Sequence, residues 1–345
     1  MKKIFSSRKI QEKKETSQLL REVSNAAKSD HCLLCGKKNT PICNSHIVPQ
    51  FILKKIADNG MICYGQSLYK KSESMFETKK GVKTAFTFHL ICRDCDKNRF
   101  KNYEDPNTIL NFENLHNNIK NQILKEMALK THLAHIYSKA KSLKLREIVF
   151  NDEINTIHTL GLRTAFEIDI DEHFQYIKTL SKTQKTTSFT FDVLYNNLLD
   201  YEVGIATQTI IAYQYDLLGN QLFNPKDFSS TNFVKYFYLM ILPYEGKTRI
   251  MFYIERKHKI LCQSIINQFN DLSPEEKLHF LFISLIIHDE QFYINPTLQE
   301  QIRKDKKLVK LYTKTDANFN SNCFNEIKNF RKYTNYLTKP KQPKK

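Results

Sequence analysis

The spacing of hydrophobic residues first indicates a long helical stretch. From Asp105 to about Phe150, Leu and Ile recur at intervals of three to five residues, as they do on the buried face of an amphipathic helix. Pro106 suits the first turn of such a helix, because an amide hydrogen would have no partner there. We therefore predict a helical region over residues 106–180, and a basic helical leader over residues 1–29.

Further along the chain the hydrophobic period shortens to two. Apolar and polar residues alternate from Phe189 to Tyr195, which is typical of a half-buried strand. Similar patterns predict strands at 203–213, 234–242 and 249–255, a turn at 243–246, and helices at 260–269 and 274–287. We expect residues 181–326 to form an antiparallel sheet with helices, so the predicted fold class is α+β.

Two histidines of the helical stretch, His132 and His135, are three residues apart and therefore share one face of the helix. No thiol or carboxylate stands beside them. We expect both to be surface residues, with metal binding as the alternative.

Composition supports a folded protein with a sizeable core. Of the 345 residues, 41% are hydrophobic, and 24 Phe and 17 Tyr supply large apolar side chains, which excludes a disordered chain. The length predicts two or three folded units. Because the sequence contains neither a run of 18 apolar residues nor a signal peptide, we expect a cytoplasmic protein without a membrane partner.

The net charge of +17 is concentrated at the two ends of the chain. Residues 1–105 contain 21 Lys and Arg against 11 Asp and Glu, and a predicted basic tail, residues 327–345, contains seven basic residues and no acid. Residues 106–326 contain 25 of each sign. Such a distribution favours a polyanionic partner, namely DNA or RNA. The alternative is that these lysines serve only solubility.

Cysteine spacing carries the strongest chemical signal, because four of the eight cysteines form two Cys-x-x-Cys pairs. The pairs are Cys32 with Cys35 and Cys92 with Cys95. Together they can place four thiolates around one ion, which is the tetrahedral shell of structural zinc. In a large intracellular chain this spacing favours metal over disulfides. We predict one structural Zn²⁺, with core cysteines or a redox pair as the alternative.

Between the two pairs stands the segment Ser45-His46-Ile47-Val48-Pro49. This order of motifs resembles the zinc-containing branch of the HNH endonucleases, a treble-clef fold, over residues 30–105. The resemblance implies that His46 is the general base for phosphodiester cleavage and that Asn59 orients it. It also implies that Asp96 helps to bind a catalytic Mg²⁺ or Mn²⁺.

Ser45 departs from the family pattern, in which an acidic residue precedes the general base. A hydroxyl is a much poorer ligand for a hard divalent cation than a carboxylate. Either another acid, such as Glu104 or Asp94, takes its place, or the nuclease chemistry has been lost.

The segment after the last cysteine alternates basic and aromatic residues. On a helix Lys97 and Lys101 would share one face, and in HNH folds this helix lies along the nucleic acid. We therefore predict that Lys97, Arg99 and Lys101 contact phosphates. The alternative is an ordinary amphipathic helix whose aromatic residues pack against the zinc site.

Two functions of different classes fit this pattern. The leading hypothesis is a nucleic-acid-binding protein with an HNH-like zinc module, which would be a metal-dependent endonuclease if His46 acts as general base, for example in defence against foreign nucleic acid. The competing hypothesis is a non-catalytic, zinc-stabilised binding or interaction protein, and Ser45 supports it.

Overall fold

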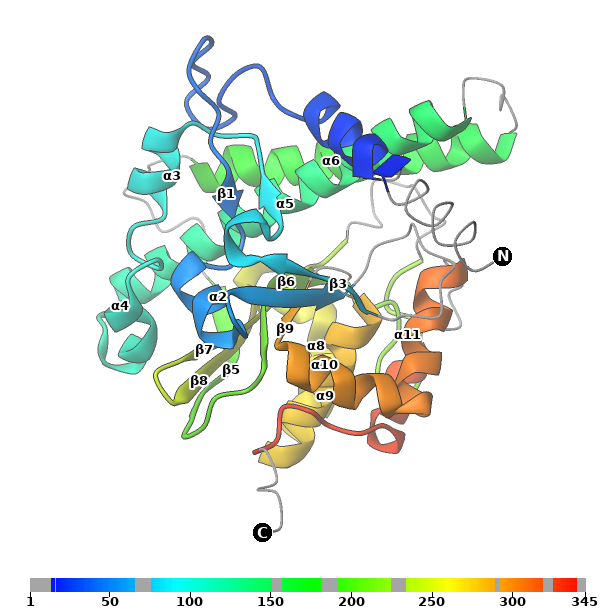
Figure 1. Ribbon diagram of the computed structural model, residues 1–345. Coiled ribbons are helices and arrows are strands. Elements are labelled where there is room, and N and C mark those ends of the chain that lie inside the picture. Colours follow the sequence, from blue (N-terminus) through cyan, green and yellow to red (C-terminus); the bar gives the residue numbers. More distant parts are fainter. Residues whose placement is uncertain are drawn as a thin grey trace. The chain divides into compact units, whose positions relative to one another are not determined.

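The computed structural model describes residues 14–15, 17–65, 76–150, 157–181, 191–224, 234–288, 292–318 and 325–339 (Figure 1). The chain forms two compact units that are interleaved in the sequence. Unit 1 comprises Met1–Ile47, Thr87–Asn102 and Lys125–Lys185, and unit 2 comprises Val48–Phe86, Tyr103–Leu124 and Thr186–Lys345. The stretch 48–86, between the two Cys-x-x-Cys pairs, therefore belongs to a different unit from the pairs themselves.

Unit 1 contains helices and a short antiparallel pair of strands. Its elements are a helix at 17–26, β1 (Ser45–His46), β4 (Thr87–Phe88), α3 (Arg93–Arg99), the part of α5 (Asn117–Phe150) from Lys125 onward, and α6 (Ile157–Ser181). In the strand pair, Ser45 stands opposite Phe88 and His46 opposite Thr87. Three backbone hydrogen bonds then join the N-terminal segment to residues 89–91, just before α3 begins.

Unit 2 is built on a sheet of seven described strands, in the order β3-β2-β9-β6-β7-β8-β5, and all neighbours are antiparallel. The strands are β2 (Met61–Gly65), β3 (Phe76–Gly81), β5 (Phe191–Leu199), β6 (Ile205–Ile211), β7 (Phe237–Tyr244), β8 (Lys247–Glu255) and β9 (Tyr293–Ile294). The turn from β7 to β8 consists of Glu245 and Gly246, whose φ angles of 50° and 76° suit a tight hairpin. The predicted α+β class with an antiparallel sheet is confirmed.

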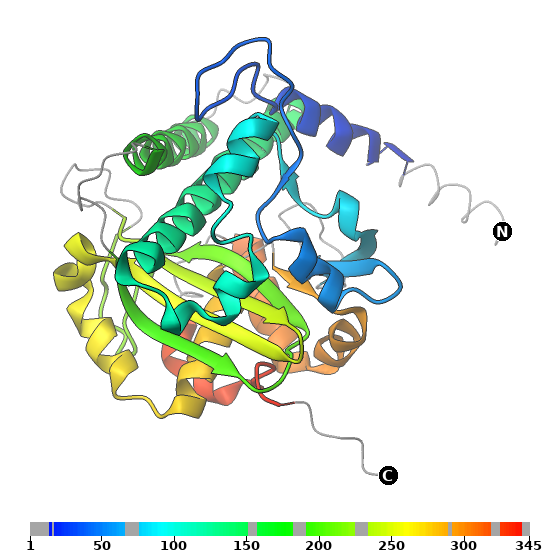
Figure 2. The ribbon, with the colours of Figure 1, turned by 90° about the vertical axis from the view of Figure 1, so that its left-hand side faces the viewer.

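Both faces of this sheet are covered, which explains why almost every side chain of the central strands β6 and β7 is buried. On one face, Leu239 and Phe252 belong to the main apolar core, which includes residues of the C-terminal helices. On the other face, Tyr238 stacks on Tyr253, and the Tyr253 hydroxyl donates to the carbonyl of Leu124 at 3.3 Å. In Figure 2, the helical segment 106–124 lies in front of the strands, and the orange helices lie behind them.

Apart from the helices of residues 103–124, the remaining elements of unit 2 are short helices around the sheet. They are α2 (Gln50–Ile56), η1 (Val82–Thr84), α7 (Arg256–Lys259), η3 (Ile260–Cys262), α8 (Gln263–Asn270), α9 (Pro274–His288), α10 (Pro296–Lys304), α11 (Lys306–Asn318) and η4 (Asn325–Lys332). Part of the predicted basic tail also packs here, since Ile327, Phe330 and Leu337 are fully buried. Within the described residues, no helix is both long and apolar enough to span a membrane.

The helical stretch predicted from Asp105 is interrupted in the structure. It consists of α4 (Pro106–Leu110), η2 (Phe112–Asn114) and then α5. The buried guanidinium of Arg249 donates to the carbonyls of Ile109 and Leu110, at 3.2 and 2.8 Å. In a continuous helix those carbonyls would accept hydrogen bonds from backbone amides one turn later in the chain. The helical region therefore consists of separate helices, because a side chain 140 residues away satisfies the end of α4.

Candidate metal centre

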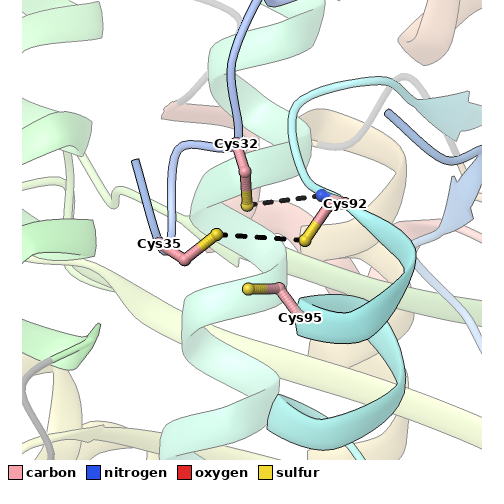
Figure 3. A group of neighbouring side chains, drawn as sticks. All are labelled: Cys32, Cys35, Cys92 and Cys95. Atoms are coloured by element: carbon pink, nitrogen blue, oxygen red, sulfur yellow. Dashed lines mark hydrogen bonds between the residues drawn. The ribbon is translucent and has the colours of Figure 1, made fainter. Parts of the chain in front are cut away.

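The four paired cysteines lie together in unit 1 (Figure 3). Their sulfur atoms all lie within 4.8 Å of one another, and the Sγ atoms of Cys35 and Cys92 are 3.9 Å apart. A tetrahedral shell with metal–sulfur bonds of about 2.3 Å requires sulfur atoms about 3.8 Å apart. These cysteines could therefore hold one metal ion, and their predicted clustering is confirmed.

Local backbone geometry explains how the first pair forms a compact turn. The amide of Gly36 donates to the carbonyl of Cys32 at 2.8 Å, and the Cys32 amide donates to the carbonyl of Lys37 at 3.1 Å. Gly36 has a φ of 71°, in the left-handed region that glycine adopts without strain. The turn brings Cys32 and Cys35 to the same side of the loop.

The second pair is positioned by α3. Cys92 is the residue immediately before the helix and Cys95 lies in its first turn, so both sulfur atoms face the first pair (Figure 3). The Cys92 amide also donates to the Cys32 sulfur at 3.3 Å. Burial would raise the pKa of the Cys32 thiol, but hydrogen bonds from backbone amides, that of Cys92 foremost, lower it to about 7. Such amides favour the thiolate, which is the form that binds metal.

A polar cluster around Asp96 lies directly after the second pair. One oxygen of the Asp96 carboxylate, Oδ1, accepts a hydrogen bond from the Ser45 hydroxyl at 2.6 Å. The same oxygen lies 3.2 Å from the ammonium nitrogen of Lys130, on α5. The Lys130 side chain is only 1% exposed, and its ammonium lies 4.6 Å from the centre of the Phe100 ring. Asp96 is therefore held by a hydroxyl from one side of the module and a buried cation from another.

A Mg²⁺ or Mn²⁺ ion at Asp96 would have to share this carboxylate with the Lys130 ammonium. Mg²⁺ binds carboxylate oxygens at about 2.1 Å, so an ion on Oδ1 of Asp96 would lie within about 5 Å of the Lys130 ammonium. Charges of +2 and +1 at that distance repel by about 7 kcal/mol at an effective dielectric constant of about 20. The Asp96 carboxylate attracts such an ion and opposes this repulsion, but Ser45 adds no second negative charge of the kind that the family pattern provides. The role of Asp96 as a ligand of Mg²⁺ or Mn²⁺ stays a prediction, and this geometry disfavours it.

The other residues of the implied nuclease site belong to different units. His46 is half-buried on β1 in unit 1. Asn59 belongs to unit 2, where Asn59 and Gly60 form the tight turn before β2, with φ angles of 50° and 73°. The Asn59 amide group donates to the carboxylate of Asp58 at 3.1 Å. The turn thus accounts for Asn59 by itself.

The predicted phosphate contacts lie on or just beyond α3. Lys97 is exposed on the helix, but Lys101 lies outside it, because α3 ends at Arg99. The expectation that Lys97 and Lys101 share a helical face was therefore wrong, although both side chains are exposed. Burial, and to a lesser extent the positive charge of Arg99, lower the pKa of Lys125. Like charges held near each other favour an anionic partner.

Comparisons with known proteins add no family to this picture. No family model, curated protein or solved structure matches the chain.

A second group of buried polar residues in unit 1 was predicted incorrectly. His132 is fully buried instead of lying on the surface, and its Nδ1 atom lies 2.9 Å from Nδ1 of His173 on α6. The His135 ring centre lies 5.5 Å from that of His173. These histidines join α5 and α6, and the spacing of His132 and His135 within one helix could not reveal a partner on another.

Proposed function

We propose that unit 1 is a zinc-stabilised module that binds nucleic acid. The observation that carries this proposal is the group of exposed or partly exposed cations next to the four cysteines. They are Lys97 and Arg99 on α3, Lys101 just after it, and Lys125, whose pKa the charge of Arg99 helps to lower. Cations on a short helix that is fixed at its first turn by a metal centre can contact successive phosphates of a polyanion.

Zinc is the metal that this donor set favours. Four thiolates at tetrahedral spacing suit Zn²⁺, and such closed shells are structural, because no coordination position remains for a substrate. Strands β1 and β4 pair with each other, and α3, which positions the second pair of cysteines, follows them in the chain. This order agrees with the HNH-like, treble-clef resemblance. The zinc would fix α3 against the N-terminal turn.

Binding, in preference to cleavage, is the function that the polar cluster supports. Cleavage through His46 would need a cation on the Asp96 carboxylate, and the Lys130 ammonium already lies beside that oxygen. The competing class, a zinc-stabilised interaction protein without a nucleic-acid partner, would leave the cations around α3 without a role.

Charge reversal at Lys97, Arg99 and Lys101 should weaken binding to both duplex DNA and RNA by roughly tenfold or more. Each lost phosphate contact removes about one unit from the slope of log affinity against log salt concentration. The triple Lys→Glu and Arg→Glu variant should therefore show a slope smaller by about 3 in fluorescence anisotropy titrations. The matched control reverses three exposed lysines of unit 2, Lys306, Lys307 and Lys310. Equal losses in both variants, or no binding by wild type, would contradict the proposal.

Nuclease assays test the competing activity directly. We expect no cleavage of DNA or RNA above background when Mg²⁺ or Mn²⁺ is added to zinc-loaded wild-type protein. His46→Ala should leave zinc content and nucleic-acid affinity unchanged. Cation-dependent cutting that His46→Ala reduces by about 10²-fold or more would instead identify His46 as the general base.

A further inference from the structure

We propose that the Lys130 ammonium takes the place of a divalent cation on the Asp96 carboxylate, so that the module binds its polyanion without Mg²⁺ or Mn²⁺. This inference deepens the proposed function. Its affinity test rests on the proposed nucleic-acid binding, whereas its NMR test does not. It concerns how the negative charge of Asp96, which lies among the cations of α3, is neutralised.

The geometry places the lysine where it can act only on this module. Its side chain is 1% exposed, so the ammonium cannot reach out to a ligand in solvent. It lies 3.2 Å from Oδ1 of Asp96 and against the face of the buried Phe100 ring. A buried ammonium requires a compensating charge, and Asp96 supplies it.

Asp96 in turn lies where an uncompensated charge would interfere with binding. It is one position before the exposed Lys97 and three before Arg99, and its own side chain is 25% exposed. A free carboxylate at this point would repel phosphates that approach those cations. The ion pair removes that repulsion by means of a residue that belongs to the chain itself. Ser45 fits the same scheme, since a hydroxyl can donate to Asp96 without adding a second negative charge.

Removal of the Lys130 charge should therefore create a dependence on divalent cations. Lys130→Met leaves the Asp96 carboxylate without its counter-ion, and nucleic-acid affinity should fall by roughly fivefold, as expected for one uncompensated, partly exposed charge. About 1 mM Mn²⁺ should restore the affinity, because the ion can then bridge Asp96 and a phosphate. Wild type should show no gain from Mn²⁺ at constant ionic strength.

A second readout does not depend on nucleic acid. Mn²⁺ broadens NMR signals of nearby amides, even when it binds weakly. In Lys130→Met the amides around Asp96 should broaden on addition of Mn²⁺, whereas in wild type they should not. The double variant Lys130→Met with Asp96→Asn is the matched control, and it should lose both the broadening and the rescue by Mn²⁺. Zinc content, measured in each variant, verifies that the module is folded.

The outcomes separate this inference from the proposed function. Broadening around Asp96 in wild type, or wild-type binding that needs Mg²⁺, would overturn the inference and leave nucleic-acid binding intact. A folded Lys130→Met protein without any Mn²⁺ effect would overturn it as well. Absence of nucleic-acid binding in all variants would contradict the proposed function, while the NMR test would still decide the role of Lys130. If Lys130→Met does not fold, Lys130→Gln keeps a hydrogen-bond donor of similar length, and the wild-type arms decide by themselves.

Discussion

Cys92→Ser should abolish metal binding and unfold unit 1. Purified wild-type protein is expected to contain about one zinc per chain, and the variant close to none. Structural zinc sites contribute an apparent ~10–16 kcal/mol to small modules, far more than the packing of a seven-residue helix can replace. Cys92 also lies at the start of α3, so loss of its thiolate removes the ligand that ties the beginning of this helix to the first pair. Elemental analysis and limited proteolysis would measure the two effects.

Two cysteines that belong to neither pair serve as controls for this experiment. Cys43 lies in unit 1, and Cys63 is buried in unit 2, where its thiol donates to Gln299 at 3.0 Å. Cys43→Ser and Cys63→Ser should both retain the full zinc content. Metal-free wild-type protein, or a Cys92→Ser variant that keeps its zinc, would remove the basis of the proposed function.

The parts of this protein that the sequence predicts are those in which nearby residues act together. Each Cys-x-x-Cys pair is a local unit, because a three-residue separation alone brings both thiolates to one side of a turn. The strands β5 to β8 are likewise visible as alternating or continuous apolar runs. Whether the two cysteine pairs lie close together depends on long-range folding. Their proximity was nevertheless predictable, because one zinc ion needs four ligands.

Long-range partners account for what sequence reasoning missed. Lys130 is 34 positions after Asp96, and in the sequence it resembles any lysine of a solvated helix. Its burial follows from the packing of α5 against α3, which no local pattern records. The break after α4 has the same kind of cause, since Arg249 comes from β8. Helices α10 and α11 were also missed, because their apolar positions are few and they are buried on one side only.

We expect the second large effect when the pH is lowered, because the buried histidines between α5 and α6 should then destabilise the folded protein. His132 stacks on Tyr176 at 4.5 Å, and its Nδ1 atom faces Nδ1 of His173, so at least one of the two rings must be neutral to accept the proton of the other. Charged neighbours are Asp169, 3.6 Å from His173, and Lys139, which pairs with Asp169 at 3.0 Å. Burial is the main cause that lowers the pKa of each histidine.

The pKa of His132 falls well below its usual value, that of His135 to about 3 and that of His173 to about 4. In the unfolded chain the same groups bind protons near pH 6.5, so the free energy of unfolding is fully retained above that pH and is lost as the pH falls toward 4. His173 alone accounts for about 3 kcal/mol over this interval, at about 1.4 kcal/mol per pH unit.

Urea unfolding of zinc-loaded protein between pH 7 and pH 4.5 should therefore show a steep decline in stability. The double variant His132→Leu with His173→Leu keeps the zinc centre, and its stability should vary less with pH than that of wild type. Identical pH dependence in the two proteins would mean that the buried histidines do not contribute, and that loss of zinc explains the whole effect of acid.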